Sequence, residues 1–403
     1  MRYSAVLLIL FFTLAMMSNC DVTNPAGEET ENESEQVLSH FQGEGSWSAL
    51  GLANMTVHSV KVFNEHLFAA TKDGIYKMEL NQLDGDWELL GFASDTTEVR
   101  NIVFLSEEEW LAKIRYTHIN EHGDHDPEEF PIVHRTSDGG ASWEPDLSSY
   151  IEGTIYYMSS ISKHNSCYET LFAYRGSMIR SNDLGENWDH IPISDELEVL
   201  SFVDVIYTTD HHPDQIWYGG STGFFNAVTV KSTDFGETWS GLLPPEDARG
   251  DGVVKAIALS PVDELVVLQS TRPYSLAKST DGGDNWDERL KEESEAVIVN
   301  SLQKSIQSAD YVYAAGTWSN RSPLDRGHEF DFEEEREQEK LYLLISDDFG
   351  EYWSIAFNSE APSGLETNDL AIAETGSNET LFLATTGGVF SLIFEGHETR
   401  EEK

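Results

Sequence analysis

The sequence predicts an all-β protein built from one antiparallel unit that recurs along the chain, and three observations support this prediction. An eight-residue box, Ser/Thr-x-Asp-x-Gly-x-x-Trp, occurs five times. The first residues of the copies are 45, 51, 47 and 67 residues apart, which is the range of supersecondary repeats. Short apolar runs bounded by turn residues recur throughout, whereas helical periodicity is scarce. The copies are Thr136–Trp143, Ser181–Trp188, Ser232–Trp239, Ser279–Trp286 and Ser346–Trp353.

Each residue type in the box suits a tight turn between two strands. The Asp side chain can accept backbone N–H groups within the turn. The Gly at the fifth position can adopt a positive φ without a steric penalty, and the Trp can pack the hairpin onto its sheet. We therefore interpret the boxes as folding elements rather than catalytic ones. The structural positions are Asp138, Trp143, Asp183, Trp188, Asp234, Trp239, Asp281, Trp286, Asp348 and Trp353.

These boxes resemble the Asp-box repeats, also called BNR repeats, of the sialidase-like superfamily of β-propellers. The resemblance covers nearly all of the chain after residue 45. It implies that each box lies between the third and fourth strands of a blade, on the rim away from the ligand site. In its repeats the chain is also similar to the single propellers of the photosystem II assembly factor and the sortilin-type receptor domain.

The strand-like runs outside the boxes predict additional blades. A unit with a degraded box at Leu83–Trp87 precedes the first copy, and only three strand-like runs follow the last copy. The segment Ser46–Leu50 can supply the missing strand, which would close the ring and remove its open sheet edges. We therefore predict a seven-bladed β-propeller with four-stranded antiparallel blades, the last closed by the N-terminal strand. The tryptophans that mark the blades are Trp47, Trp87, Trp143, Trp188, Trp239, Trp286 and Trp353.

The start of the chain resembles a bacterial lipoprotein signal peptide. An apolar stretch, Ala5–Met17, precedes Cys20, which is the expected lipidation site. We expect a protein that is lipid-anchored at the bacterial cell envelope, in the periplasm or on the outer-membrane surface, with secretion after ordinary cleavage as the alternative. The predicted parts are residues 1–20, the signal peptide; 21–45, an acidic disordered tether; 46–396, the propeller; and 397–403, a charged tail.

The charge balance limits the classes of partner. The chain has 72 acidic residues against 25 Lys and Arg, a formal net charge of −47. This argues against nucleic acid, because phosphate binding needs clustered cations. It also restricts membrane contact to the lipid anchor. Three interpretations of the excess of acidic residues remain: a surface adapted to salty surroundings, binding of divalent cations, and a basic partner. No cofactor is indicated apart from a divalent cation, and we expect a monomer.

Two enlarged loops, Arg115–His134 and Thr317–Lys340, are candidate functional segments because function concentrates on long loops of rigid scaffolds. The first loop contains imidazole and carboxylate groups that could bind a transition metal, although a solvated polar loop is the alternative. The weak metal candidates are His118, His122, Asp124 and His125.

Aromatic and Arg residues near the ends of the second strands could stack on sugars or bind a carboxylate. Ordinary loop residues are the alternative interpretation. The ligand-binding candidates are Arg115, Tyr116, Tyr174, Arg175, Tyr218, Arg272, Trp318 and Arg321.

The sequence departs from the pattern of the sialidases that it resembles. Those enzymes take the first of three substrate-binding arginines from an Arg-Ile-Pro motif, which is missing here, and no arginine occurs between Arg2 and Arg100. Xyloglucanase-type enzymes use two such propellers, and this chain has the length of one. We therefore predict a non-catalytic, membrane-tethered propeller that binds a glycan or protein partner. The alternative is a glycoside hydrolase, sialidase-like or of another two-carboxylate type, for which no catalytic residue can be named.

Overall fold

The computed structural model divides the chain into two compact units, Met1–Val37 and Leu38–Lys403. The described residues all belong to the second unit and contain strands and turns but no helix, so none of their segments is a helix able to cross a membrane. The described residues are 39–40, 47–93, 97–116, 118–119, 125–126, 131–146, 160–163, 170–174, 178–191, 200–222, 226–242, 253–272, 275–290, 296–319, 340–356, 365–376 and 378–394.

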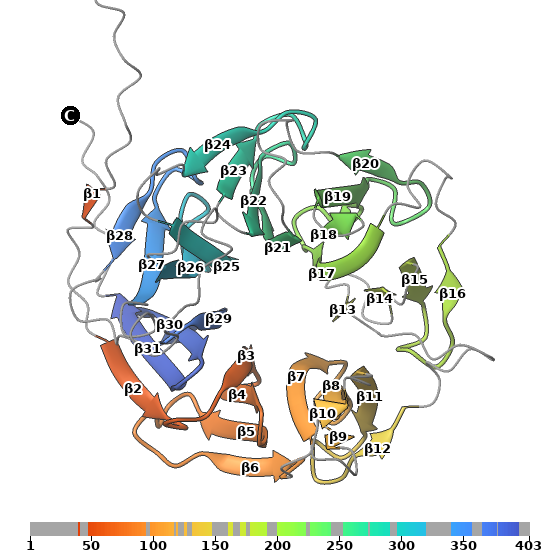
Figure 1. The fold of residues 1–403 in the computed structure, drawn as a ribbon, viewed down its shortest axis with the longest axis vertical. Coiled ribbons are helices and arrows are strands. Elements are labelled where there is room, and N and C mark those ends of the chain that lie inside the picture. Colours follow the sequence, from red (N-terminus) through yellow and green to blue (C-terminus); the bar gives the residue numbers. More distant parts are fainter. Residues whose placement is uncertain are drawn as a thin grey trace, which may run out of the picture. The chain divides into compact units, whose positions relative to one another are not determined.

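Seven four-stranded antiparallel sheets surround a central axis as the blades of a β-propeller (Figure 1), which confirms the predicted fold. Blade 1 contains β3 (Val57–Phe63), β4 (His66–Thr71), β5 (Gly74–Glu79) and β6 (Glu88–Gly91). Blade 2 contains β7 (Thr97–Phe104), β8 (Trp110–Tyr116), β11 (Pro131–Thr136) and β12 (Glu144–Pro145). Blade 3 contains β13 (Ser160–Lys163), β14 (Leu171–Tyr174), β15 (Met178–Ser181) and β16 (Asp189–His190).

The remaining blades repeat this order from the axis outwards. Blade 4 contains β17 (Leu200–Thr208), β18 (Ile216–Thr222), β19 (Asn226–Ser232) and β20 (Ser240–Leu242). Blade 5 contains β21 (Val253–Leu259), β22 (Val267–Arg272), β23 (Ser275–Ser279) and β24 (Asp287–Leu290). Blade 6 contains β25 (Ala296–Lys304), β26 (Val312–Ser319), β27 (Lys340–Ser346) and β28 (Ser354–Ala356), with β1 (Ser39–His40) parallel to β28. Blade 7 contains β29 (Thr367–Thr375), β30 (Asn378–Thr385), β31 (Gly388–Phe394) and β2 (Trp47–Gly51).

The N-terminal strand closes the ring, as predicted. Strand β2 pairs antiparallel with β31, with Trp47 opposite Leu392, and thus provides the outer strand of blade 7. The indole Nε1 of Trp87 donates a hydrogen bond of 2.7 Å to the carbonyl oxygen of Leu50, which joins blade 1 to this strand. The seam between the two ends of the propeller is therefore held by backbone pairing and by a side chain of the next blade.

The second strand of each blade lies between two packed faces. Strand β14 is buried at all four residues, and β30 is buried at all residues but the first. Such strands consist of nearly continuous apolar runs because both faces of the sheet contact neighbouring blades. Between blades 1 and 2, for example, Phe68 and Trp110 pack edge to face with ring centroids 5.1 Å apart. The core is therefore a ring of interfaces between blades.

All five boxes form the turn between the third and fourth strands of a blade. In blade 4, the hydroxyl of Ser232 donates to Oδ1 of Asp234 at 2.8 Å and accepts the N–H of Gly236 at 2.8 Å. The N–H and the hydroxyl of Thr238 donate to the two oxygens of Asp234, at 2.8 and 2.5 Å. These hydrogen bonds hold the pKa of Asp234 at about 2, the largest cause being the Thr238 hydroxyl. The carboxylate therefore organises the turn.

The boxes define one face of the ring. The N–H of Phe235 donates to the carbonyl of Asp214, in the turn between the first and second strands of the same blade, and Gly282 and Phe349 make the equivalent bonds in blades 5 and 6. The box turns and these inner turns therefore lie together on what we call the box face. The turns between second and third strands lie at the other ends of the strands, on the box-free face.

Candidate binding site at the central channel

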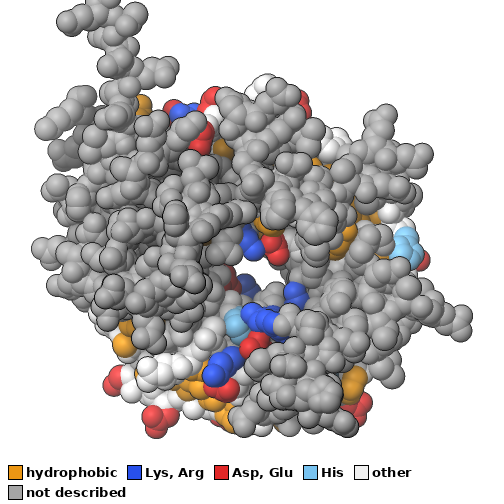
Figure 2. All heavy atoms as spheres, viewed as in Figure 1, with side chains coloured by type: hydrophobic (Ala, Val, Ile, Leu, Met, Phe, Trp, Pro, Cys, Tyr) orange, Lys and Arg blue, Asp and Glu red, His pale blue; other side chains and the backbone are white. Residues whose placement is uncertain are grey.

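A cavity of about 800 Å³ occupies the centre of the ring, and the first strand of every blade contributes to its lining. We call it the central channel, and Figure 2 shows its opening at the middle of the molecule. The first strands run in the same direction around it, so that their starts lie toward the box-free face and their ends toward the box face. Its charged lining residues are Lys61, Lys163, Lys255, Asp204, Asp210 and Asp369.

A β-bulge interrupts six of the seven first strands at equivalent positions within the described residues. At this position in each strand, one residue has no partner on the second strand, so that the ladder shifts by one residue; β17 has a second shift between Leu200 and Phe202. Bulges of this kind redirect side chains and often lie beside functional sites. The extra residues are all polar: His58, Arg100, Asp204, Lys255, Asn300 and Asn368.

The bulged residues connect neighbouring blades around the channel. Lys255 Nζ lies 2.8 Å from Oδ2 of Asp204, which joins blades 4 and 5. Asn300 donates through Nδ2 to the carbonyl of Thr367 at 2.6 Å, and Asn368 donates to the carbonyl of Val57 at 2.7 Å. These contacts join blades 6, 7 and 1. A polar belt therefore supports the inner wall of the ring.

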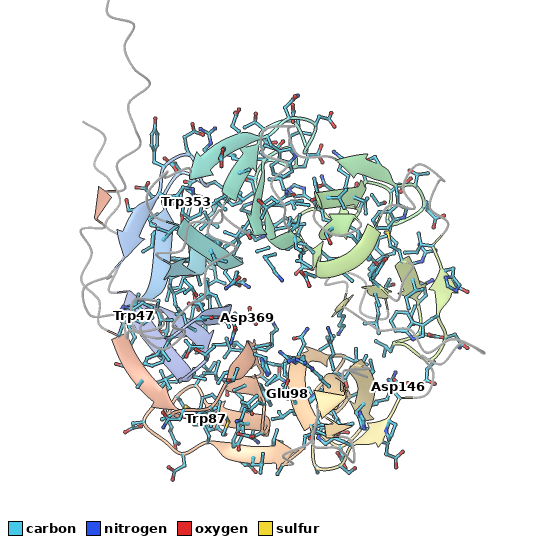
Figure 3. The ribbon with its side chains drawn as sticks, viewed as in Figure 1. Trp47, Trp87, Glu98, Asp146, Trp353 and Asp369 are labelled. Atoms are coloured by element: carbon cyan, nitrogen blue, oxygen red, sulfur yellow. The ribbon has the colours of Figure 1, made fainter. Side chains whose placement is uncertain are left out.

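Three basic side chains surround one carboxylate at the start of blade 2. Glu98 Oε2 lies 2.5 Å from Nη2 of Arg100, 3.7 Å from Nη1 of Arg115 and 3.8 Å from Nε2 of His58. Glu98 and Arg100 lie on β7, Arg115 lies at the end of β8, and His58 is the bulged residue of β3. Figure 3 labels Glu98 on the inner side of blade 2. We call these four residues the Glu98 cluster.

The imidazole of His58 is neutral in this environment. Burial, together with the charges of Arg100 and Arg115, lowers the pKa of His58 to about 3. Its Nδ1 lies 3.3 Å from Nη1 of Arg100 and accepts that hydrogen bond, which assigns the proton to Nε2. The His58 Nε2 is buried and has no hydrogen-bond partner within the described residues. The cluster therefore has two guanidinium groups, one carboxylate and one unused donor.

Further cations lie near the Glu98 cluster. Burial lowers the pKa of Lys113 to about 8, and the charges of Arg100 and Lys255 lower it as well, whereas Asp204 raises it. Lys113 is half-buried on β8 and remains protonated at neutral pH. Among the described residues, the cations Arg100, Arg115, Lys113 and Lys255 and the carboxylates of Glu98 and Asp204 lie together at this mouth of the channel. In a chain with a net charge of −47, a group of cations is thus gathered at the channel, and Figure 2 shows Lys and Arg side chains beside the opening, together with some Asp and Glu.

The structure brings one of the sequence-derived ligand candidates, Arg115, into this cluster. Tyr218 is fully buried, and its hydroxyl donates to the carbonyl of Ala173 at 3.3 Å, so it belongs to the core between blades 3 and 4. Tyr174 is 4% exposed and packs in the same core. Neither tyrosine is available to a ligand, because the second strands bury the positions that the sequence placed at a surface.

Other candidates cannot be placed at the side-chain level. Three of them lie at or near the ends of second strands, Tyr116 on β8, Arg272 on β22 and Trp318 on β26, but their side chains are outside the described part of the chain. Arg175 and Arg321 lie outside the described residues altogether. His118 and His125 belong to the short hairpin formed by β9 (His118–Ile119) and β10 (His125–Asp126), whereas His122 and Asp124 lie outside the described residues. Among the described residues, no group of His, Cys, Asp and Glu could hold a metal ion.

Sequence reasoning missed His58, Glu98 and the role of Arg100 in this cluster. A weak signal was present, because five of the six bulged residues directly follow a valine at the start of a first strand. These pairs are Val57-His58, Val99-Arg100, Val203-Asp204, Val254-Lys255 and Val299-Asn300.

Similar solved structures share the fold of this chain. YCF48 from Cyanidioschyzon merolae is 14% identical with a TM-score of 0.57, and 88% of this chain covers 99% of that one. A YCF48 structure bound to a D1 peptide is 13% identical with a TM-score of 0.58, and 90% of this chain covers 100% of that one. The extracellular domain of the one-component system BT4673 from B. thetaiotaomicron is 10% identical with a TM-score of 0.54, and 88% of this chain covers 40% of it. The sequence matches no protein-family model and no curated protein. At these identities the likeness establishes the propeller fold.

Proposed function

We propose that this propeller is a non-catalytic binding protein whose box-free face binds an acidic segment of a protein partner at the Glu98 cluster. The observation that carries the proposal is the composition of this cluster. The guanidinium groups of Arg100 and Arg115 both lie within 4 Å of the Glu98 carboxylate and are each 30% exposed, and the buried Nε2 of His58 has no acceptor within the described residues. A carboxylate from a ligand would accept charge-assisted hydrogen bonds from these partly exposed guanidinium groups.

The charges close to the ligand matter more here than the acidity of the whole chain. Exposed charges separated by more than about 8 Å are largely screened at physiological ionic strength. The half-buried guanidinium groups of Arg100 and Arg115, each 30% exposed, are screened less. An acidic ligand group is therefore attracted at the channel mouth and repelled by most of the remaining surface, which favours one defined site.

A protein partner is supported by the structures that share the fold. YCF48 is a propeller of similar size, and one of its structures holds a D1 peptide. That ligand belongs to YCF48, and we take from it that a single ring of this architecture is sufficient for peptide binding.

Affinity selection from a library of random peptides tests the proposal. Selected peptides should be enriched in Asp and Glu, and replacing Arg115 with Gln should weaken their binding by at least about tenfold, as expected for a charge-assisted contact. Arg180→Gln is the matched control, because Arg180 contacts Phe235 and Glu237 in a box of the next blade. Binding should be unchanged in that variant, and both variants should have the melting temperature of the parent protein.

Two results would overturn this function. Peptides selected without an excess of acidic residues, or binding that survives the loss of Arg115 and Arg100 together, would exclude the Glu98 cluster as the binding site. Release of reducing sugar from a polysaccharide or of product from a fluorogenic sialoside by the purified protein would instead favour the glycoside hydrolase alternative.

The Asp-box family and the lipid anchor are further parts of the proposal. The position of all five boxes between third and fourth strands, with one repeated hydrogen-bond pattern, supports the Asp-box group. The apolar segment before Cys20 supports lipidation and a location at the cell envelope. Metabolic labelling with a radioactive fatty acid tests the anchor. The label should be lost in Cys20→Ser, and a labelled variant would contradict the assignment.

A further inference from the structure

The lining of the central channel as a whole differs in charge from the Glu98 cluster. The lining of the channel contains three lysines and three aspartates. Lys61 Nζ lies 3.0 Å from Oδ2 of Asp369, and Lys255 Nζ lies 2.8 Å from Oδ2 of Asp204. Figure 3 labels Asp369 on the inner side of blade 7. Because the lysines and aspartates of the lining are equal in number and two of each form ion pairs, the lining favours neither an anion nor a cation.

An aromatic surface lies beside these polar groups. The rings of Phe63 and Phe104 stack with centroids 4.4 Å apart and an angle of 3° between their planes. Both residues line the channel and are only half-buried, although they end the apolar interface between blades 1 and 2. Aromatic rings of this kind offer an apolar surface to the C–H groups of a ligand.

The shape and the walls of the channel restrict the class of ligand. A volume of about 800 Å³ is in the range of small-molecule sites and is too small for a folded partner. The bulges interrupt six of the first strands that form the wall, so the wall is a poor template for the addition of a peptide strand. A ligand that is bound through many side-chain hydrogen bonds and one apolar face fits these conditions better than an extended peptide.

From these features we infer that the central channel binds a neutral oligosaccharide, which is a second site beyond the proposed protein-binding function. One sugar ring stacks against the Phe63–Phe104 pair. Its hydroxyl groups bind the belt of polar side chains, in which Asn300 is fixed by its bond to Thr367. Gln303 also lines the channel, and its side chain has no hydrogen bond within the described residues, so its amide is available to the ligand.

Saturation-transfer NMR and calorimetry with four neutral trisaccharides, maltotriose, cellotriose, xylotriose and chitotriose, test this site. At least one should bind below about 10 mM, a weak affinity that is measurable by both methods. Gln303→Trp is the main variant, because it fills the channel without removing a described side-chain contact, and it should abolish binding. Phe63→Ala should weaken binding by about tenfold or more through the loss of stacking.

The controls separate this inference from the protein-binding function. Arg115→Gln should leave sugar binding unchanged, and Gln303→Trp should leave the binding of acidic peptides unchanged. Melting temperatures identify variants that fail to fold, and Gln303→Trp remains informative if Phe63→Ala is unstable. Failure of all four trisaccharides to bind, or binding that persists in a folded Gln303→Trp variant, would overturn the inference.

Discussion

Replacing Tyr313 with Phe is expected to destabilise the seam between blades 6 and 7. Tyr313 on β26 is fully buried, and its hydroxyl donates to Oε2 of Glu379 on β30 at 2.6 Å. Glu379 is 1% exposed, and its Oε1 accepts the N–H of Ile306 at 2.6 Å. Burial and the neighbouring carboxylate raise the pKa of Tyr313, so the hydroxyl remains a donor at neutral pH. The contact links two strands and a turn of adjacent blades.

The expected magnitude follows from the loss of one buried hydrogen bond to a charged group. Such bonds contribute about 1.5–3 kcal/mol, and removal of a single oxygen leaves the aromatic packing in place. The free energy of unfolding should therefore fall by about that amount. Urea denaturation followed by tryptophan fluorescence measures it as a lower midpoint with an unchanged slope.

Tyr352→Phe is the matched control in the same blade. Tyr352 is 62% exposed in the fifth box, where it replaces the polar residue that donates a side-chain hydrogen bond in the other boxes, so the free energy of unfolding should change by less than about 0.5 kcal/mol. The reasoning is refuted if Tyr313→Phe is as stable as this control, because the buried contact would then contribute nothing.

Three further predictions concern the box, the cluster and the closure of the ring. The pKa of Asp234 is about 2 in the folded protein and about 3.9 when unfolded, so its contribution is present above pH 4 and is lost as pH falls toward 2. In Asp234→Asn, the melting temperature should fall less between pH 4 and pH 2 than it does in the parent protein. An equal fall in both proteins would contradict this prediction. For His58, the unfolded state binds a proton near pH 6.5 and the folded state only near pH 3, so stability falls as pH decreases between these values. His58→Gln should reduce that slope, to which one group contributes at most about 1.4 kcal/mol per pH unit, as measured by urea denaturation at several pH values. Equal slopes would show that folding does not change the protonation of His58 and would contradict the prediction. Trp87→Phe removes the hydrogen bond to Leu50, so the free energy of unfolding should fall by about 1 kcal/mol and the amides of β2 should exchange hydrogen faster. Unchanged stability and exchange would show that the seam depends on backbone pairing alone.

The fold was predictable because its information is local. Each box contains the hydroxyl, carboxylate and glycine that one turn requires, so residues such as Ser232, Asp234 and Gly236 reveal the turn without reference to distant contacts. Counting these turns and the strand-like runs also revealed that one strand was missing. The closure by β2 could then be predicted, because a ring of sheets leaves no edge unpaired.

The candidate site was less predictable because it depends on register. The bulges place His58 and Arg100 beside each other although they are distant in sequence, and no strand propensity signals a bulge. Tyr218 failed as a ligand candidate for a related reason. Its strand continues to Thr222, so the tyrosine lies within the packed part of the blade instead of at its end.

The antiparallel pairing of β2 with β31 determines from which side the polypeptide joins the ring. Strand β31 starts after the turn at Thr385–Gly388 and runs toward the boxes, so its partner β2 begins at Trp47 on that same side. Strand β2 therefore begins on the box face, whereas Arg115 of the Glu98 cluster lies at the end of β8, toward the box-free face.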